Sequence, residues 1–146
     1  MSIIVWDGIT LAADRQGTSA GMRFTEPKMS VMDGPEGLIV CAWTGTAAYG
    51  KALAHWYLAK RPNAEYPEFQ KDAETWCRLI VARPGGCLFY EQTPYPFVVH
   101  DEFAAWGSGR GFASGALAMG ATARKAVEVA SLFSVGCGCG VEAYDL

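Results

Sequence analysis

The sequence lacks a basic patch. Its 12 Lys and Arg residues are outnumbered by 15 Asp and Glu residues, never stand more than two together, and leave a net charge of −3 at pH 7. Proteins that bind nucleic acid carry clustered Lys and Arg that neutralise phosphates. We therefore expect no nucleic-acid partner.

Signals for membranes and for secretion are also missing. No apolar stretch is long enough to cross a bilayer, and the first 14 residues hold no basic segment followed by an apolar one. The five cysteines are an odd number and include no CxxC spacing, which favours a reduced compartment. We expect a soluble, cytoplasmic protein that does not bind membranes.

Apolar residues, by contrast, are plentiful. Hydrophobic residues make up 51% of the chain and charged residues 18%, so disorder is excluded as its general state. A chain of 146 residues is the size of one domain and can bury a core. We expect a single domain over residues 1–146.

Turn residues between apolar segments predict two β-hairpins at the start of the chain. Asp7-Gly8 joins residues 3–6 to residues 9–13, and a turn at residues 33–36 joins residues 28–32 to residues 37–43. Both turns contain residues that tolerate the backbone angles of tight connections.

The apolar period then changes to that of a helix. Tyr49, Leu53 and Trp56 share one face of a helix that starts at Thr46 and ends before Pro62. Three strands, two small-residue-rich helices and a final strand follow, and Pro96 places the third of these strands at a sheet edge. Their residues are 77–81, 86–90 and 95–100 for the strands, 112–119 and 126–133 for the helices, and 141–144 for the last strand. This order predicts an α+β fold with helices layered on antiparallel sheets.

Ser2 follows the initiator Met directly and precedes the first strand. Met1 is normally removed before so small a residue, and a terminal Ser carries a nucleophilic hydroxyl and a basic amine on one residue. The α-amine has a reference pKa of about 7.7 to 8.0, which suits a base near neutral pH. Many unrelated proteins begin with Met-Ser, so this feature alone is weak.

Several motifs in sequence order strengthen this interpretation. Residues 2–18 read S-I-I-V-W-D-G-I-T-L-A-A-D-R-Q-G-T, and they resemble the opening of proteasome β-subunits and of the bacterial HslV peptidase. The remaining matches are Lys28 and the segments W-T-G-T at 43–46, W-G-S-G at 106–109 and G-C-G-V-E at 138–142. The resemblance covers nearly the whole chain and implies the N-terminal-nucleophile hydrolase fold, a four-layer αββα sandwich of two antiparallel sheets.

The resemblance also implies catalytic roles. Ser2 takes the place of the family's nucleophilic Thr, and Lys28 supplies the positive charge that favours a neutral amine. Asp14 holds Lys28 by a charge-assisted hydrogen bond. The alternative for Asp14 and Lys28 is an ordinary surface ion pair.

Further roles fall on the strand-to-helix junctions. The backbone N–H groups of Thr44 and Gly45 form the oxyanion hole, although a plain helix start capped by Thr46 is the alternative. Ser108 hydrogen-bonds near the terminal amine, or else caps the following helix. The backbone of Thr18 pairs with an extended peptide substrate.

The sequence departs from the family at four positions near the site, and one of them is Thr44, where the family usually has Gly. Ser2 lacks the γ-methyl group of Thr. Ser134 stands where many β-subunits have an Asp, and Cys137 stands where they have a second Ser.

Other candidate sites are weaker. His100, Asp101 and Glu102 are adjacent, so their side chains diverge, and Cys137 and Cys139 have no zinc-spaced partners. We expect neither metal nor cofactor.

The aromatic residues divide into two expected groups. We place Trp6, Trp43 and Trp106 in the core or at subunit interfaces. We expect Trp56, Tyr57 and Tyr66 to be exposed and available for interfaces.

These observations favour a subunit of a self-compartmentalising peptidase that cleaves peptides or unfolded proteins through Ser2. The resemblance implies a homo-oligomeric ring and an ATPase unfoldase partner. Two alternatives remain open: a catalytically inactive scaffold or binding protein of the same fold, and an amidase that acts on a small molecule.

Overall fold

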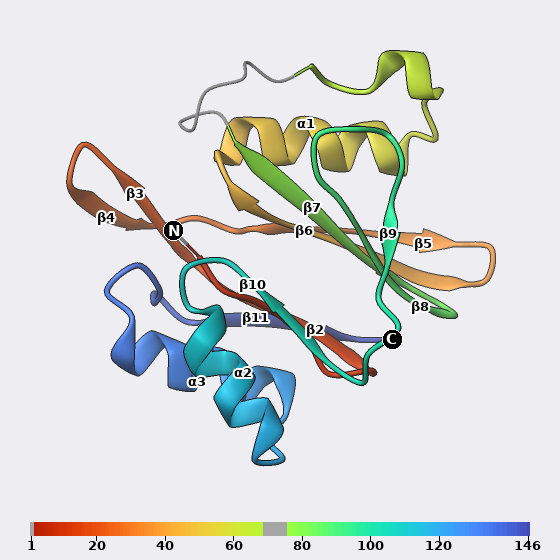
Figure 1. The fold of residues 1–146 in the computed structure, drawn as a ribbon. Coiled ribbons are helices and arrows are strands. Elements are labelled where there is room, and N and C mark those ends of the chain that lie inside the picture. The colour runs from red at the N-terminus through yellow and green to blue at the C-terminus, as the bar shows by residue number, and fades with distance from the viewer. Residues whose placement is uncertain (1, 69–75) are drawn as a thin grey trace.

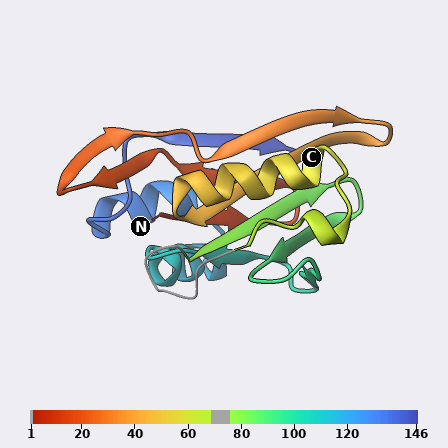
Figure 2. The same cartoon turned by 90° about the horizontal axis from the view of Figure 1, so that it is seen from above.

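Two main antiparallel sheets stack face to face in the protein, and helices cover their outer faces (Figures 1 and 2). The structure, a computed structural model, describes residues 2–68 and 76–146. The four-stranded sheet has the order β10-β1-β2-β11 and the five-stranded sheet the order β5-β6-β7-β8-β9. β3 and β4 form a separate two-stranded hairpin.

The strands of the four-stranded sheet come from both ends of the chain. They are β1 (Ile4–Trp6), β2 (Thr10–Asp14), β10 (Ala104–Trp106) and β11 (Val141–Asp145). The separate hairpin consists of β3 (Gln16–Ser19) and β4 (Met22–Thr25).

The five-stranded sheet is built from consecutive strands. They are β5 (Met29–Gly34), β6 (Gly37–Gly45), β7 (Cys77–Arg83), β8 (Gly86–Tyr90) and β9 (Phe97–Val98). The α-helices are α1 (Ala47–Leu58), α2 (Arg110–Ala118) and α3 (Ala123–Phe133), and a short 3-10 helix covers Asn63–Glu65.

Strand β2 lies at the centre of this arrangement, and all five of its residues are buried. Leu11 and Ala13 face the core between the two sheets, whereas Ala12 faces helices α2 and α3. The helix side of that contact consists mainly of alanines, including Ala113, Ala126 and Ala130, so the helices can approach the sheet closely. Burial of β2 on both faces anchors the residues at its end, including Asp14.

Helix α1 covers the other outer face. Leu53 and Trp56 pack on β6, β7 and β8, which confirms the helical face expected from the sequence. The expectation that Trp56, Tyr57 and Tyr66 are exposed is wrong. Trp56 is 6% exposed, and its ring centroid lies 4.9 Å from that of Tyr66 and 5.3 Å from that of Tyr90, because these rings close the core beside α1.

Most of the predicted elements are confirmed. Both N-terminal hairpins, the three helices and the α+β four-layer sandwich are present, and β9 lies at a sheet edge as Pro96 indicated. The tryptophans placed in the core, Trp6, Trp43 and Trp106, are buried. Sequence analysis missed the β3–β4 hairpin and β10, and β9 is shorter than expected. The single domain over residues 1–146 stays a prediction.

Two further observations on the described residues concern membrane-spanning helices and disulfides. None of their helices has the length and apolarity that crossing a membrane requires. All five cysteines are free thiols.

The contact between α1 and β6 yields a stability prediction. A Cβ on Gly50 would lie 2.2 Å from Cγ of the buried Trp43, so Gly50→Ala should destabilise the protein by about 1 to 3 kcal/mol. Gly115 in α2 has open space around its Cβ position, so Gly115→Ala should stabilise by about 0.5 to 1 kcal/mol. Urea unfolding of both variants measures the difference. Equal effects of the two substitutions would contradict the packing described for α1.

Candidate active site

Ser2 is held by its backbone beside the segment that leads into α2. Its nitrogen donates to Oγ of Ser108 at 3.2 Å, and its carbonyl oxygen accepts from the N–H of Gly109 at 3.2 Å. Its own Oγ is buried and has no hydrogen-bond partner among the described residues. The hydroxyl is therefore not occupied by a structural hydrogen bond.

Gly107 makes this close approach possible. Its φ of +107° is in the region that favours glycine, and a Cβ there would lie 2.2 Å from the carbonyl oxygen and 3.0 Å from Oγ of Ser2. Any side chain at position 107 would displace Ser2.

Asp14 and Lys28 form a buried ion pair. Nζ of Lys28 lies 2.6 Å from Oδ1 of Asp14, and the exposed fractions of the two residues are 6% and 0%. The alternative of a surface ion pair is therefore wrong. The pair lies where β2 ends and β5 begins, next to Ala13 of β2 and Met29 of β5, which are both buried in the core between the sheets.

The carboxylate of Asp14 has three further donors. Oδ1 accepts from the N–H of Ile3 at 3.1 Å, and Oδ2 accepts from the N–H groups of Gln16 at 3.3 Å and Gly138 at 3.0 Å. Such charge-assisted bonds satisfy a buried carboxylate. They tie the residue after Ser2 to the same group that holds Lys28.

The junction of β6 and α1 contains two further residues predicted from the sequence, Thr44 and Gly45. Gly45 has a φ of +103°, and a Cβ there would lie 2.1 Å from the carbonyl oxygen of Trp76, so only glycine fits. Thr46 occupies the N-cap position of α1 without a side-chain capping bond. Ser108 does not cap α2, whose N-cap residue is Gly109, because its hydroxyl is engaged with the backbone of Ser2.

These residues line one cleft of about 950 Å³. Of the seven residues predicted from the sequence, six line it: Ser2, Thr18, Lys28, Thr44, Gly45 and Ser108. Asp14 is not among the lining residues and is buried behind Lys28. The structure thus brings together side chains from β3, from the start of β5, from the end of β6 and from the segment before α2.

Cys137 extends the contacts of Ser108. Its Sγ lies 3.9 Å from Oγ of Ser108. Burial raises the pKa of the Cys137 thiol, and a hydrogen bond with the Ser134 side chain lowers this pKa in part. A thiol with a raised pKa stays protonated at neutral pH and is a poor nucleophile. Cys137 therefore contributes a neutral contact rather than a competing reactive group.

Several cleft residues were not predicted from the sequence, and Gln16, Arg78 and Arg110 are among them. Gln16 is buried and donates from Nε2 to the carbonyl oxygen of Val135 at 3.0 Å, whereas Arg78 and Arg110 bring charge to the wall. Their positions depend on the β3 register and on how β7 and α2 meet the cleft, which no sequence pattern revealed. Arg110 alone had a visible signal, a cation at the start of a helix.

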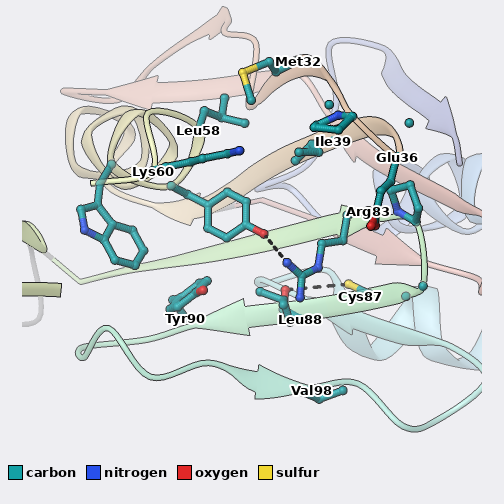
Figure 3. Close-up of a pocket in the computed structure, with 18 of the residues that line it drawn as sticks. Met32, Glu36, Ile39, Leu58, Lys60, Arg83, Cys87, Leu88, Tyr90 and Val98 are labelled. Carbon is teal, nitrogen blue, oxygen red and sulfur yellow. Dashed lines mark hydrogen bonds between the residues drawn. The ribbon is translucent and has the colours of Figure 1, made fainter. Parts of the chain in front are cut away.

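A second hollow of about 820 Å³ lies on the outer face of the five-stranded sheet, beyond the end of α1 (Figure 3). Arg83 and Tyr57 meet there, with Nη1 of Arg83 3.1 Å from the Tyr57 hydroxyl. Burial raises the pKa of Cys87, a lining residue, to about 12. None of the site residues predicted from the sequence lines this hollow, so the candidate active site is the cleft at Ser2.

Within residues 2–68 and 76–146, no three His, Cys, Asp or Glu side chains are grouped so as to hold a metal ion.

Comparisons with known proteins give matches among solved structures. No protein-family model matches the sequence, and no curated protein matches it. Thiobacillus denitrificans BPH matches with a TM-score of 0.72 and 21% identity over 99% of this chain and 96% of that one. The same protein in complex with Epoxomicin matches with a TM-score of 0.72 and 19% identity over 100% and 98%.

Two further structures share the fold. Eukaryotic HslV from Trypanosoma brucei has a TM-score of 0.70 and 21% identity over 99% of this chain and 98% of that one. Anbu, an ancestral beta-subunit from Yersinia bercovieri, has a TM-score of 0.71 and 9% identity over 100% and 82%. The chain therefore has the fold of HslV and proteasome-like N-terminal-nucleophile hydrolases, and the resemblance seen in the sequence is confirmed for the fold.

The buried pair leads to a prediction on stability. Lys28→Met leaves the Asp14 carboxylate buried without its counter-charge and should destabilise the protein by about 3 to 5 kcal/mol. Lys125→Met removes a lysine whose ion pair with Glu128 is exposed, so it should change stability by less than about 1 kcal/mol. Chemical denaturation of both variants measures the difference. A Lys28→Met variant as stable as Lys125→Met would contradict a structural role for the pair.

Proposed function

We propose that the chain is a peptidase subunit, similar to HslV and proteasome β-subunits, that hydrolyses peptide bonds with Ser2 as nucleophile. The observation that carries this proposal is the convergence of Ser2, Ser108 and the buried Lys28–Asp14 pair on one cleft. Fold similarity supports the class of enzyme, and the cleft residues support the chemistry.

Removal of Met1 makes the Ser2 nitrogen a free α-amine. The amine takes the hydroxyl proton as Oγ attacks the substrate carbonyl carbon, and it then passes that proton to the leaving amine. A water molecule hydrolyses the resulting ester and restores Ser2. The positive charge of Lys28 favours the neutral amine and the developing alkoxide.

The backbone at the end of β6 stabilises the tetrahedral intermediate in this proposal. The N–H groups of Thr44 and Gly45 are the proposed donors to the oxyanion, and each such donor is commonly worth about 10² to 10³ in rate. Since main-chain donors do not depend on the side chain, Thr44 serves as well as glycine.

Strand β3 offers a place for an extended substrate. Among the described residues β3 pairs only with β4, so its other edge is open, and Thr18 on β3 lines the cleft. A peptide that adds to this edge as a strand gains main-chain hydrogen bonds with little dependence on sequence. We therefore propose peptides and unfolded proteins as substrates.

A catalytically inactive scaffold or binding protein of the same fold is the second candidate. Ser2 is 2% exposed, and Ser134 brings no charge to the place where many β-subunits have an Asp. If Met1 is retained, the Ser2 nitrogen is an amide and has no basicity. An amidase acting on a small molecule would use the same residues on a shorter substrate.

An exposed apolar surface supports a homo-oligomer. The helix-layer patch consists of residues on or next to α2 and α3 that are 46% to 91% exposed: Phe112, Met119, Leu132, Phe133 and Val135. The rings of Phe112 and Phe133 stack with centroids 5.6 Å apart. Contiguous exposed apolar surface is typical of interaction sites. We propose that this patch contacts other copies in a closed ring assembly in the cytoplasm, with an ATPase unfoldase as the further partner.

The nucleophile is tested by substitution. Ser2→Ala should abolish turnover of short fluorogenic peptides, whereas Ser114→Ala in α2, outside the cleft, should leave it unchanged.

Intact mass should show that the active protein lacks Met1. Epoxomicin, found in complex with BPH, should raise the melting temperature of the protein without Met1 and should not raise that of a chain that retains it.

Two outcomes would reject the proposed chemistry. The first is unchanged turnover by Ser2→Ala, which would place the reaction elsewhere. The second is a fully active preparation whose mass includes Met1.

Assembly is tested separately by native mass spectrometry. The wild-type protein should form a closed oligomer, and Phe133→Glu should shift it toward smaller species because a buried charge opposes the contact. Ile9→Glu, at the equally exposed Ile9 in the β1–β2 turn, should not. A wild-type protein that is monomeric at micromolar concentration would favour the binding-protein alternative.

A further inference from the structure

Four charged residues line the cleft, and three of them have ionic partners. Lys28 pairs with Asp14 at 2.6 Å, Glu26 with Lys51 at 2.6 Å, and Arg78 with Glu91 at 2.6 Å. The fourth is Arg110, which is exposed and has no carboxylate within ion-pair distance in residues 2–68 and 76–146. The cleft wall therefore carries one positive charge that the described chain does not neutralise.

The local sequence increases this imbalance. Arg110 is the first residue of α2, and the first turn of that helix contains no acidic residue. A positive charge near a helix N-terminus is electrostatically unfavourable, and acidic residues are the usual occupants there. Because no acidic side chain among the described residues offsets this charge, a bound anion is a suitable counter-charge.

The backbone places Arg110 close to Ser2. Its Nη1 donates to the carbonyl oxygen of Gly107 at 3.0 Å, and Gly107 is the residue whose Cβ position lies 2.2 Å from the Ser2 carbonyl oxygen. The guanidinium group is thus tied to the segment that contacts the proposed nucleophile. Four of its five N–H donors remain for a ligand.

The position of Arg110 in the cleft indicates which part of a peptide substrate it contacts. In the proposed reaction the acyl part of the peptide lies between the edge of β3 and the end of β6, where Thr18 and Gly45 line the cleft. Gly107, Ser108 and Arg110 form the part of the cleft wall that contacts the backbone of Ser2, whereas Trp76 and Arg78 line the wall beside Gly45. The leaving-group part of the peptide therefore passes Arg110.

We propose that Arg110 is a specificity-determining residue that binds a carboxylate on the leaving-group side of the scissile bond. This proposal rests on the proposed peptidase function. The planar guanidinium group can bind a carboxylate through two parallel hydrogen bonds. The carboxylate belongs to an Asp or Glu side chain just after the scissile bond, or to the free C-terminus of a short peptide.

The test uses peptides that share one acyl part and differ after the scissile bond. One pair compares Glu with Gln in an amidated peptide, and a second pair compares a free C-terminal carboxylate with a carboxamide. For the wild-type protein we expect KM to be roughly tenfold lower for the carboxylate member of at least one pair, with kcat little changed. The pair that shows the preference identifies the source of the carboxylate.

Substitutions assign the preference to Arg110. Arg110→Gln should abolish the KM difference between the two members of each pair, and Arg110→Lys should restore part of it through charge alone. Arg124→Gln is the matched control, since Arg124 is also exposed and donates to a backbone carbonyl, that of Ala143 at 3.3 Å, outside the cleft. This control should keep the full preference.

A binding measurement separates failure of this inference from failure of the proposed function. Fluorescence anisotropy of the labelled peptides on a Ser2→Ala variant should show tighter binding of the carboxylate member, and Arg110→Gln in that background should remove the difference. Hydrolysis without any preference for the carboxylate would overturn the role of Arg110 and keep the peptidase. A preference that survives Arg110→Gln would also overturn it. Absence of hydrolysis with a preserved binding difference would reject the peptidase and support Arg110 as an anion site.

Discussion

The buried pair of Asp14 and Lys28 is the constraint on which the rest of the site depends. Two charges removed from water cost several kcal/mol each unless they are paired and fully hydrogen-bonded. Asp14 meets this requirement with donors from Ile3, Gln16 and Gly138 in addition to Lys28. Because these donors lie far apart in the chain, satisfying one carboxylate brings the N-terminal strand, the β3 hairpin and the segment before β11 together.

The second constraint is close backbone contact at two glycines. Gly107 lies against Ser2, and Gly45 lies against Trp76, each at a distance that excludes a side chain. Both residues also have φ angles in the region that favours glycine. As a result the wall next to Ser2 is made of main chain, so the proposed oxyanion donors keep their positions even where side chains differ from those of similar proteins.

The charges of the cleft follow from the same arrangement. Lys28 is the one lysine among the described residues that line the cleft, and Cys137 next to Ser108 adds no charge because burial raises the pKa of its thiol. The charges next to Ser2 are thus the buried Lys28–Asp14 pair and the exposed Arg110, which has no ionic partner among the described residues. In the proposed mechanism the buried pair activates the nucleophile, and Arg110 selects the substrate.

The sequence by itself determined the elements with strong local signals. Asp7-Gly8 between two apolar runs specifies a hairpin, and the spacing of Leu53 and Trp56 specifies a helix face, because turn geometry and helical period act over a few residues. The motifs also identified residues that meet at one cleft, since Ser2, Lys28 and Ser108 line it and Asp14 is buried behind Lys28.

Only the tertiary structure decided the rest. The β3–β4 hairpin is mostly exposed, and β3 has no apolar alternation, so its register and the burial of Gln16 depend on contacts with Val135 and Asp14. Trp56 is buried because Tyr66 and Tyr90, distant in sequence, close around it. Arg110 became a candidate ligand-binding residue only when its neighbours were known, since whether a charge is neutralised depends on which side chains folding brings within reach.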